Sequence, residues 1–169
     1  LVSFFYESQR KTFIRKFFYL VSTLGRMSYI YHSGYGYSTR LCKSVASWFI
    51  NKYYPRHKIT LDIIHRGMKR ENCLGYCDTT GGWFRPRNFE IEIDTHLDKE
   101  TYTKTLLHEM FHMKQFIDGT LKTKRSKMYY KNELVDNYDY EDQPHEIAAR
   151  EAEETLYKEY HEERLESLR

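Results

Sequence analysis

The spacing of apolar residues along the chain predicts three helices. In three windows apolar positions recur every three or four residues, as on the buried face of an amphipathic helix. Pro55 ends the first window, Gly119 stops the second, and Pro144 suits the first position of the third. Asp98 or Thr101 can cap the second helix. The helices are expected from Thr39 to Pro55, from Thr101 to Asp118 and from Pro144 through Tyr160.

Three short segments between the first two helices have the pattern of strands. Residues 58–65 are rich in isoleucine and leucine, and residues 73–79 follow a turn. Residues 89–94 alternate strictly between apolar and acidic side chains, as a strand with one solvated face does. The order of helix, three strands, helix and helix predicts an α+β fold.

Two segments outside these elements are predicted to be irregular. Residues 31–38 contain two glycines and are typical of a linker. Residues 119–143 form a long basic, tyrosine-rich loop that has room for a short helix. The linker divides the chain into a basic aromatic N-terminal extension, 1–37, and a domain, 38–169, which is long enough for one hydrophobic core.

The N-terminal extension combines phenylalanines with arginines and lysines. This pattern suits a basic amphipathic helix that binds a partner, a nucleic acid or a membrane surface, or that docks on the domain. No window reaches the ~18 apolar residues of a membrane span. Residues 17–24 are apolar but lack the cleavage site of a secretion signal, so we expect neither a membrane span nor secretion.

Charge is distributed unevenly along the chain. Residues 141–169 carry ten acidic and four basic residues, a net charge of −6. Because the net charge of the whole chain is +3, residues 1–140 carry a net charge of +9. Such a division indicates either a polyanion-binding face or an acidic solvated helix beside a basic body, and we favour the second. The basic residues of 122–131 are open to the same two interpretations, contact with phosphates or a solvated loop.

The strongest chemical signal is the run His108-Glu109-Met110-Phe111-His112. Two histidines four residues apart on a helix point the same way, so both imidazoles can bind one zinc ion. Glu109 then lies beside the metal-bound water, where a carboxylate acts as general base. The alternative is a pair of ordinary histidines on a helix, but the motif falls within a strongly predicted one.

A catalytic zinc site needs a third protein ligand, and spacing alone does not choose it. The candidates downstream are His145, His161 or a carboxylate. Adjacent helical residues point about 100° apart, so only one of His145 and Glu146 is expected to face the metal. The candidate carboxylates are Glu146, Glu133, Glu141 and Glu151.

The motif, together with Pro144-His145-Glu146-Ile147-Ala148, resembles the gluzincin metallopeptidases, especially the small SprT-like or minigluzincin proteins encoded by phages and bacteria. The resemblance covers roughly residues 40–165. It implies a minimal zincin fold, with His108, His112 and Glu146 as zinc ligands and Glu109 as the catalytic residue. The chain lacks the His-Gly element and Cys-rich zinc ribbon of typical SprT proteins, and residues 1–37 have no counterpart in the family.

The resemblance implies a zinc metallopeptidase that acts on a peptide or protein substrate. In the family an edge strand beside the motif helix pairs with extended substrate, and residues 89–94 are the expected strand. His145, Tyr138 and Tyr140 are candidates for stabilising an oxyanion. Two alternatives stay open: a structural or assembly protein, for example in a virion, and a protease recruited to nucleic acid through the N-terminal segment and residues 122–131.

The three cysteines bear on where the protein acts. Cys42, Cys73 and Cys77 are an odd set, so we expect no disulfide framework. Cys73 and Cys77 lack the second pair of a metal knuckle, so we expect these two to be buried strand thiols. This pattern favours a reducing compartment. We therefore expect the protein in the cytoplasm of a host cell or in a virion.

Overall fold

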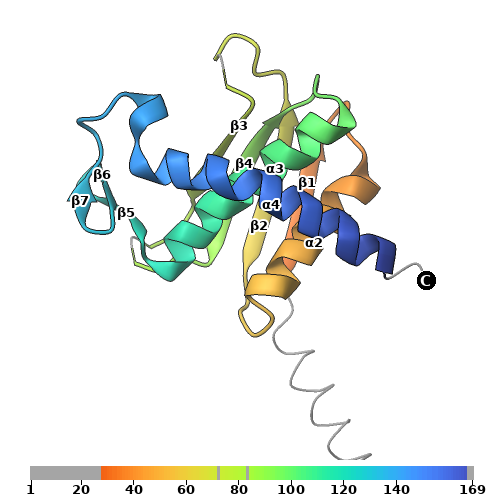
Figure 1. The fold of residues 1–169 in the computed structure, drawn as a ribbon, viewed down its shortest axis with the longest axis horizontal. Coiled ribbons are helices and arrows are strands. Elements are labelled where there is room, and N and C mark those ends of the chain that lie inside the picture. The colour runs from red at the N-terminus through yellow and green to blue at the C-terminus, as the bar shows by residue number, and fades with distance from the viewer. Residues whose placement is uncertain (1–27, 72, 83, 167–169) are drawn as a thin grey trace, which may run out of the picture.

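A computed structural model describes residues 28–71, 73–82 and 84–166, and the N-terminal segment 1–27 lies outside the described residues. The described part combines helices with two β-sheets, which confirms the α+β class (Figure 1). The elements, in chain order, are β1 Tyr29–Gly34, α2 Thr39–Tyr53, β2 Thr60–Arg66, β3 Gly75–Thr79, β4 Asn88–Asp94, α3 Lys99–Asp118, β5 Leu121–Lys124, β6 Lys127–Tyr130, β7 Glu133–Leu134, the short 3₁₀ helix η1 Tyr140–Asp142, and α4 Pro144–Glu166.

The main sheet has four strands in the order β1-β2-β4-β3. β1, β2 and β4 are parallel, and β3 pairs with β4 in the antiparallel direction. Two sequence predictions are therefore wrong. Residues 31–34 belong to β1 and not to a linker, so the sheet begins before the boundary that we placed between residues 37 and 38. The alternating strand, now β4, is an interior strand, and the edge strands are β1 and β3.

Alternation on β4 reflects the two environments of the sheet. Phe89, Ile91 and Ile93 are buried on the face that α3 covers. Glu90 and Glu92 point to the opposite face, where Arg66 of β2 forms an ion pair with Glu92. The acids of this strand therefore form part of a polar sheet face next to solvent.

The three helices lie together on one side of the main sheet (Figure 1). Asp98 caps α3, because its carboxylate accepts from the backbone N–H groups of Glu100 and Thr101, and Gly119 ends the helix in the left-handed conformation. α4 packs across α3 and reaches α2 through a hydrogen bond from Tyr160 to Ser44. No helix in the described part of the chain has the length and apolarity needed to cross a membrane.

Residues 121–134 of the segment predicted to be a long loop instead fold as a small antiparallel sheet, β5-β6-β7, and the rest of the segment holds the short helix η1, for which the prediction left room. Arg125 and Ser126 both have positive φ, as do Lys131 and Asn132, so each turn has the conformation that matches the twist of a hairpin. The sequence signal was weak because these turns carry no glycine. The hairpin lies at the end of α3 and forms a wall beside the site.

The cysteine thiols are all free. Cys42 is buried in α2, and Cys77 lies half-buried in β3 with its side chain on the α3 side of the sheet. Cys73 is half-buried but precedes the strand, so it is not the strand thiol that we expected.

Candidate metal centre

The site is built on the face of α3 that points towards α4. His108 and His112 lie one turn apart, and their Nε2 atoms are 3.1 Å from each other. His112 is only 6% exposed, and the ring of His108 lies closer to solvent. Helical spacing alone gives this convergence, as the sequence predicted.

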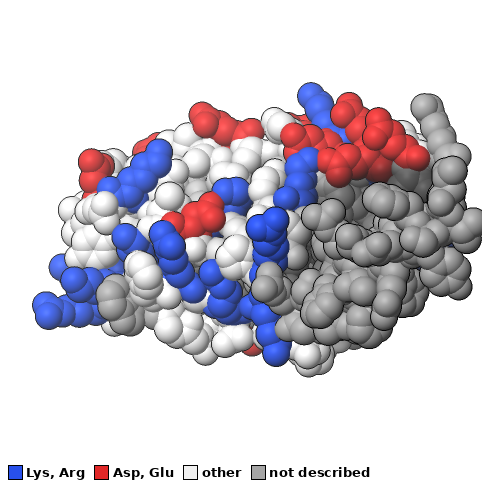
Figure 2. All heavy atoms as spheres, turned by 90° about the horizontal axis from the view of Figure 1, so that it is seen from below, with Lys and Arg blue, Asp and Glu red and all other residues white. Residues whose placement is uncertain are grey.

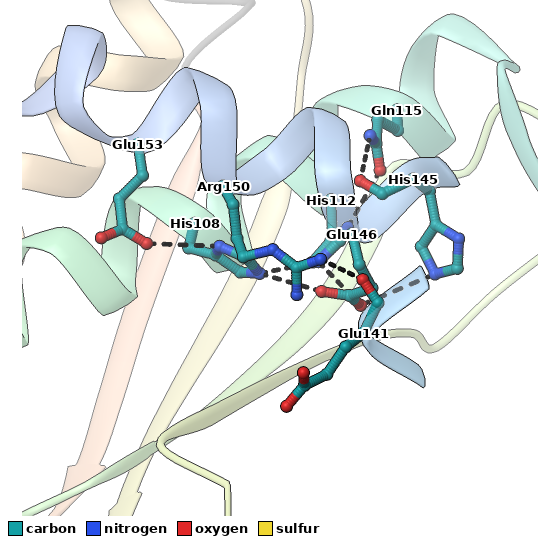
Figure 3. Close-up of polar contacts among 8 residues, drawn as sticks. All are labelled: His108, His112, Gln115, Glu141, His145, Glu146, Arg150 and Glu153. Atoms are coloured by element: carbon teal, nitrogen blue, oxygen red, sulfur yellow. Dashed lines mark hydrogen bonds and ion pairs between the residues drawn. The ribbon is translucent and has the colours of Figure 1, made fainter. Parts of the chain in front are cut away.

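Glu146 reaches the two histidines from the first turn of α4 (Figure 3). Its Oε2 lies 3.2 Å from Nε2 of His108, and its Oε1 lies 3.3 Å from Nε2 of His112. Pro144 begins the helix, and Glu146, which is 5% exposed, is buried between α3 and α4. Packing of α4 on α3 therefore completes a three-residue group that the sequence could name but not position.

The donor set fits zinc. In a tetrahedral zinc site with bonds of about 2.1 Å, neighbouring donors are about 3.4 Å apart. Here the two Nε2 atoms are 3.1 Å apart, and Glu146 places Oε2 3.2 Å from that of His108 and Oε1 3.3 Å from that of His112. Two neutral imidazoles and one carboxylate are also the ligand types of hydrolytic zinc sites. Among the described residues, His108, His112 and Glu146 form the one His/Cys/Asp/Glu group compact enough to hold a metal.

His145 takes a different orientation from its neighbour. Its Nε2 lies 3.6 Å from Oε1 of Glu146, beside the donor group but outside it. Its Nδ1 is buried and has no hydrogen-bond partner among the described residues, and burial lowers the pKa of His145 to about 4. The other third-ligand candidates, His161, Glu133, Glu141 and Glu151, lie outside the donor group.

Two residues that sequence reasoning missed support the histidines from behind (Figure 3). Oε1 of Gln115 lies 2.9 Å from Nδ1 of His112, and its Nε2 donates to the carbonyl of His145 at 3.0 Å. Oε2 of Glu153 lies 3.4 Å from Nδ1 of His108. Both contacts leave Nε2 of each histidine directed at the donor group. Helical spacing was the available signal, since Gln115 is three residues after His112 and Glu153 seven after Glu146.

Buried carboxylates control the electrostatics of the donor group. Burial lowers the pKa of His108, but its contacts with Glu146 and Glu153 outweigh burial and raise the pKa to about 9. Burial raises the pKa of Glu146, yet hydrogen bonds to His108 and His112 hold that pKa well below its ordinary value. The carboxylates around His108 therefore make this an environment that favours a positive charge, and the Glu146 carboxylate stays ionised.

Glu109 lies beside the donor group but is not part of it, and its carboxylate packs against β3. It is 6% exposed, and burial raises its pKa to about 7. The backbone of Gly75 in β3 packs against the Glu109 side chain, because a Cβ added at Gly75 would lie 2.7 Å from Oε1 of Glu109. Only a glycine lets the edge strand lie this close to the carboxylate. Sequence reasoning could not find this contact, because the two residues are far apart in the chain.

Two cavities meet at the donor group. The larger, about 530 Å³, has the β5–β6 hairpin and the start of α4 as walls, and Phe116, Leu121 and Met128 contribute apolar side chains. The smaller, about 170 Å³, contains His108, Glu109 and Arg150. Of the three oxyanion candidates, Tyr140 lines both cavities, His145 lines the larger one, and Tyr138 lines neither.

The outer edge of β3 is free of any strand in the described structure. Leu74 and Thr80 bond to β4 through Asp94 N–H to Leu74 O and Thr80 N–H to Asn88 O. Alternation then directs the backbone groups of Gly75, Cys77 and Thr79 outward. The free edge beside α3 is thus β3, in place of the strand at 89–94 that we had expected.

Comparison of the chain with protein-family models, with curated proteins and with solved structures found no match. The assignment of function therefore rests on the residues and their geometry.

Proposed function

We propose that this protein is a zinc-dependent metallohydrolase of the SprT-like or minigluzincin type that hydrolyses peptide bonds. One observation carries the proposal: His108, His112 and Glu146 converge on a single point, and the buried carboxylate of Glu109 lies beside it. Three ligands with an adjacent non-ligand carboxylate are the requirement for hydrolytic zinc chemistry. The α+β sheet, with an antiparallel edge strand next to α3, is consistent with the minimal zincin fold.

In this proposal a bound zinc ion and Glu109 have separate roles in the reaction. A bound zinc ion would polarise the substrate carbonyl and lower the pKa of a coordinated water towards ~7. Glu109 takes the proton from the attacking water and passes it to the leaving amine. Burial suits Glu109 to this exchange, because a pKa of about 7 allows it both to accept and to release a proton near neutrality.

The free edge of β3 offers a way to hold an extended peptide. Backbone groups of Gly75 and Cys77 point outward, and Gly75 lies against Glu109. A peptide that pairs with this edge has its own backbone beside the general base. Main-chain pairing confers affinity with little dependence on sequence, so selectivity must come from the cavities on either side.

Tyr140 is the proposed donor to the oxyanion that forms during attack. Tyr140 is 63% exposed, but partial desolvation and the charges of Glu146 and Glu109 raise the pKa of its hydroxyl, so it keeps its proton at neutral pH. It belongs to η1, immediately before α4, and lines both cavities. A neutral phenol at this position can donate a hydrogen bond to a developing negative charge.

The test of the proposal is Glu109→Gln, measured with a mixture of unstructured protein and peptide substrates. The variant should keep wild-type zinc and fold while activity falls roughly 10²- to 10⁴-fold, because the general base is lost. Glu151→Gln, an exposed change on α4, is the matched control and should retain activity. Zinc-loaded wild type without activity on any substrate would favour the alternative of an assembly protein.

A second candidate keeps this chemistry and adds recruitment to nucleic acid. Figure 2 shows basic side chains at the end of the molecule that carries β5–β7. Lys122, Lys124 and Arg125 line a cavity of about 360 Å³ and form no ion pair within the described part of the chain. A salt-dependent mobility shift of DNA or RNA, lost when these three residues become glutamine, would support this candidate.

A further inference from the structure

Arg150 brings a positive charge to the metal centre. It follows Glu146 by one turn of α4, so the two side chains project from the same face of the helix. Figure 3 shows its side chain extending across the donor group towards Glu141. Arg150 lines the 170 Å³ cavity together with His108 and Glu109. It is the sole Lys or Arg side chain among the residues that line the two cavities at the site.

The guanidinium of Arg150 is held in place but not neutralised. Its Nη2 donates to the backbone carbonyl of Glu141, which carries no charge. Within the described residues Arg150 forms no ion pair, although Glu153 lines the same cavity. Arg66 behaves differently, because its guanidinium pairs with Glu71 and Glu92. A tethered arginine with unused N–H donors beside a reaction centre is suited to bind an anionic group of a ligand.

We propose that Arg150 binds a carboxylate of the substrate and thereby selects peptides with a negative charge next to the cleaved bond. This inference rests on the proposed peptidase function and names its substrate class. Planar guanidinium and carboxylate groups pair through two parallel hydrogen bonds, which fixes the position of the peptide as well as its charge. The carboxylate is either the C-terminus of the peptide or an Asp or Glu side chain.

The opposite side of the site has a different character. Asp78 and Asp136 are among the residues of the larger cavity, together with the apolar group Phe116, Leu121 and Met128. The smaller cavity also contains carboxylates, Glu109 and Glu153, but none of the residues that line the larger cavity is a Lys or Arg that could pair with a substrate carboxylate. The larger cavity instead offers apolar side chains to the substrate. A peptide with its carboxylate at Arg150 and an apolar residue in the larger cavity therefore matches both sides, and the reversed placement matches neither.

Peptide binding to zinc-loaded Glu109→Gln, measured by calorimetry, tests the assignment without turnover. One series carries a single Glu, moved along an otherwise uncharged, C-terminally amidated peptide, and each Glu has a Gln counterpart. A second pair compares a free C-terminal carboxylate with an amide. Each pair is measured again after adding Arg150→Gln, Arg150→Lys or the control Lys158→Gln, an exposed change further along α4.

We expect one acid–amide pair to show a preference of roughly ten- to hundred-fold for the acid, as charge-assisted hydrogen bonds confer. Arg150→Gln should remove that preference, Arg150→Lys should keep part of it, and Lys158→Gln should leave it intact. The pair that responds identifies the source, an acidic side chain or the C-terminus. Equal binding of acids and amides, or a preference that survives Arg150→Gln, overturns the assignment.

Failure of the inference is distinguishable from failure of the proposed function. The same peptides are incubated with wild-type enzyme carrying an intact Glu109. Cleavage of acids and amides at equal rates removes the role of Arg150 and leaves the peptidase standing. If no peptide is cleaved but binding still shows an acid preference that depends on Arg150, the anion site is supported and the peptidase function is contradicted.

Discussion

The two helices of the metal centre contribute in different ways. α3 supplies His108, Glu109 and His112 within little more than one turn, so their relation is set by helical geometry alone. α4 supplies Glu146, Arg150 and Glu153, which face the site only because this helix packs across α3. The first set is local and the second is tertiary. The two histidines of α3 can therefore be placed for metal binding by the helix alone. The contributions of α4 require the folded domain.

The largest expected effect is on the local set. His108→Ala and His112→Ala should each abolish stoichiometric zinc, a loss well beyond the roughly 100-fold that an outer-shell residue contributes. Zinc content of the purified protein by atomic emission is the measurement. His96→Ala is the control, since His96 lies outside the donor group. Full zinc in both variants would remove the metal centre.

The next effect separates the two neighbours at the start of α4. Glu146→Gln should weaken zinc binding by more than 100-fold, because it removes a ligand and its negative charge. His145→Ala should spare zinc, since its ring lies beside the donors and not among them. Competition with a chelator gives both affinities. The reverse order would make His145 the third ligand.

A substitution at Gly75 tests whether the position of Glu109 on α3 also depends on the neighbouring strand β3. Gly75→Ala places a Cβ against Glu109 and should displace the carboxylate, which lowers activity about 10²-fold while zinc remains bound. Gly67→Ala is the control, because a Cβ there meets nothing closer than 3.8 Å and the backbone φ is ordinary. Equal kcat/KM in both variants would show that β3 does not constrain the general base.

The smallest effects concern the residues behind the ligands. Gln115→Ala and Glu153→Gln should each weaken zinc binding by about 10- to 100-fold, because each holds Nδ1 of one histidine. Gln115 should give the greater loss, since its contact is shorter and it also binds the His145 carbonyl. A larger loss of zinc affinity in Glu153→Gln would show that α4 contributes more to zinc binding than these distances indicate.

Strand assignment illustrates why sequence reasoning succeeded in some places and failed in others. Residues 89–94 were identified as a strand because Phe89, Ile91 and Ile93 alternate with acids. The family resemblance implied that this strand lies at the edge, but strand order depends on which segments pair across the sheet, and β3 takes the position outside β4. β1 was missed because its exposed tyrosines and glycine give no buried alternation.

The β5–β7 sheet was missed for a related reason. Its strands are short and largely polar, so they lack the apolar periodicity by which strands are recognised. The turns at Arg125-Ser126 and Lys131-Asn132 adopt positive φ without glycine. Their conformation is imposed by strand pairing, and local propensity gave little warning of it.

What the sequence determined by itself was the chemistry that helical spacing can carry. A period of 3.6 residues places His108 and His112 on one face of α3, and the caps Asp98 and Gly119 set its ends. Only the tertiary structure decided that Glu146, and not His145, reaches both imidazoles, that Gly75 lies against Glu109, and that Arg150 enters the same cavity. Those relations join residues from separate elements, and their distances depend on packing between helices and sheet, which no local spacing encodes.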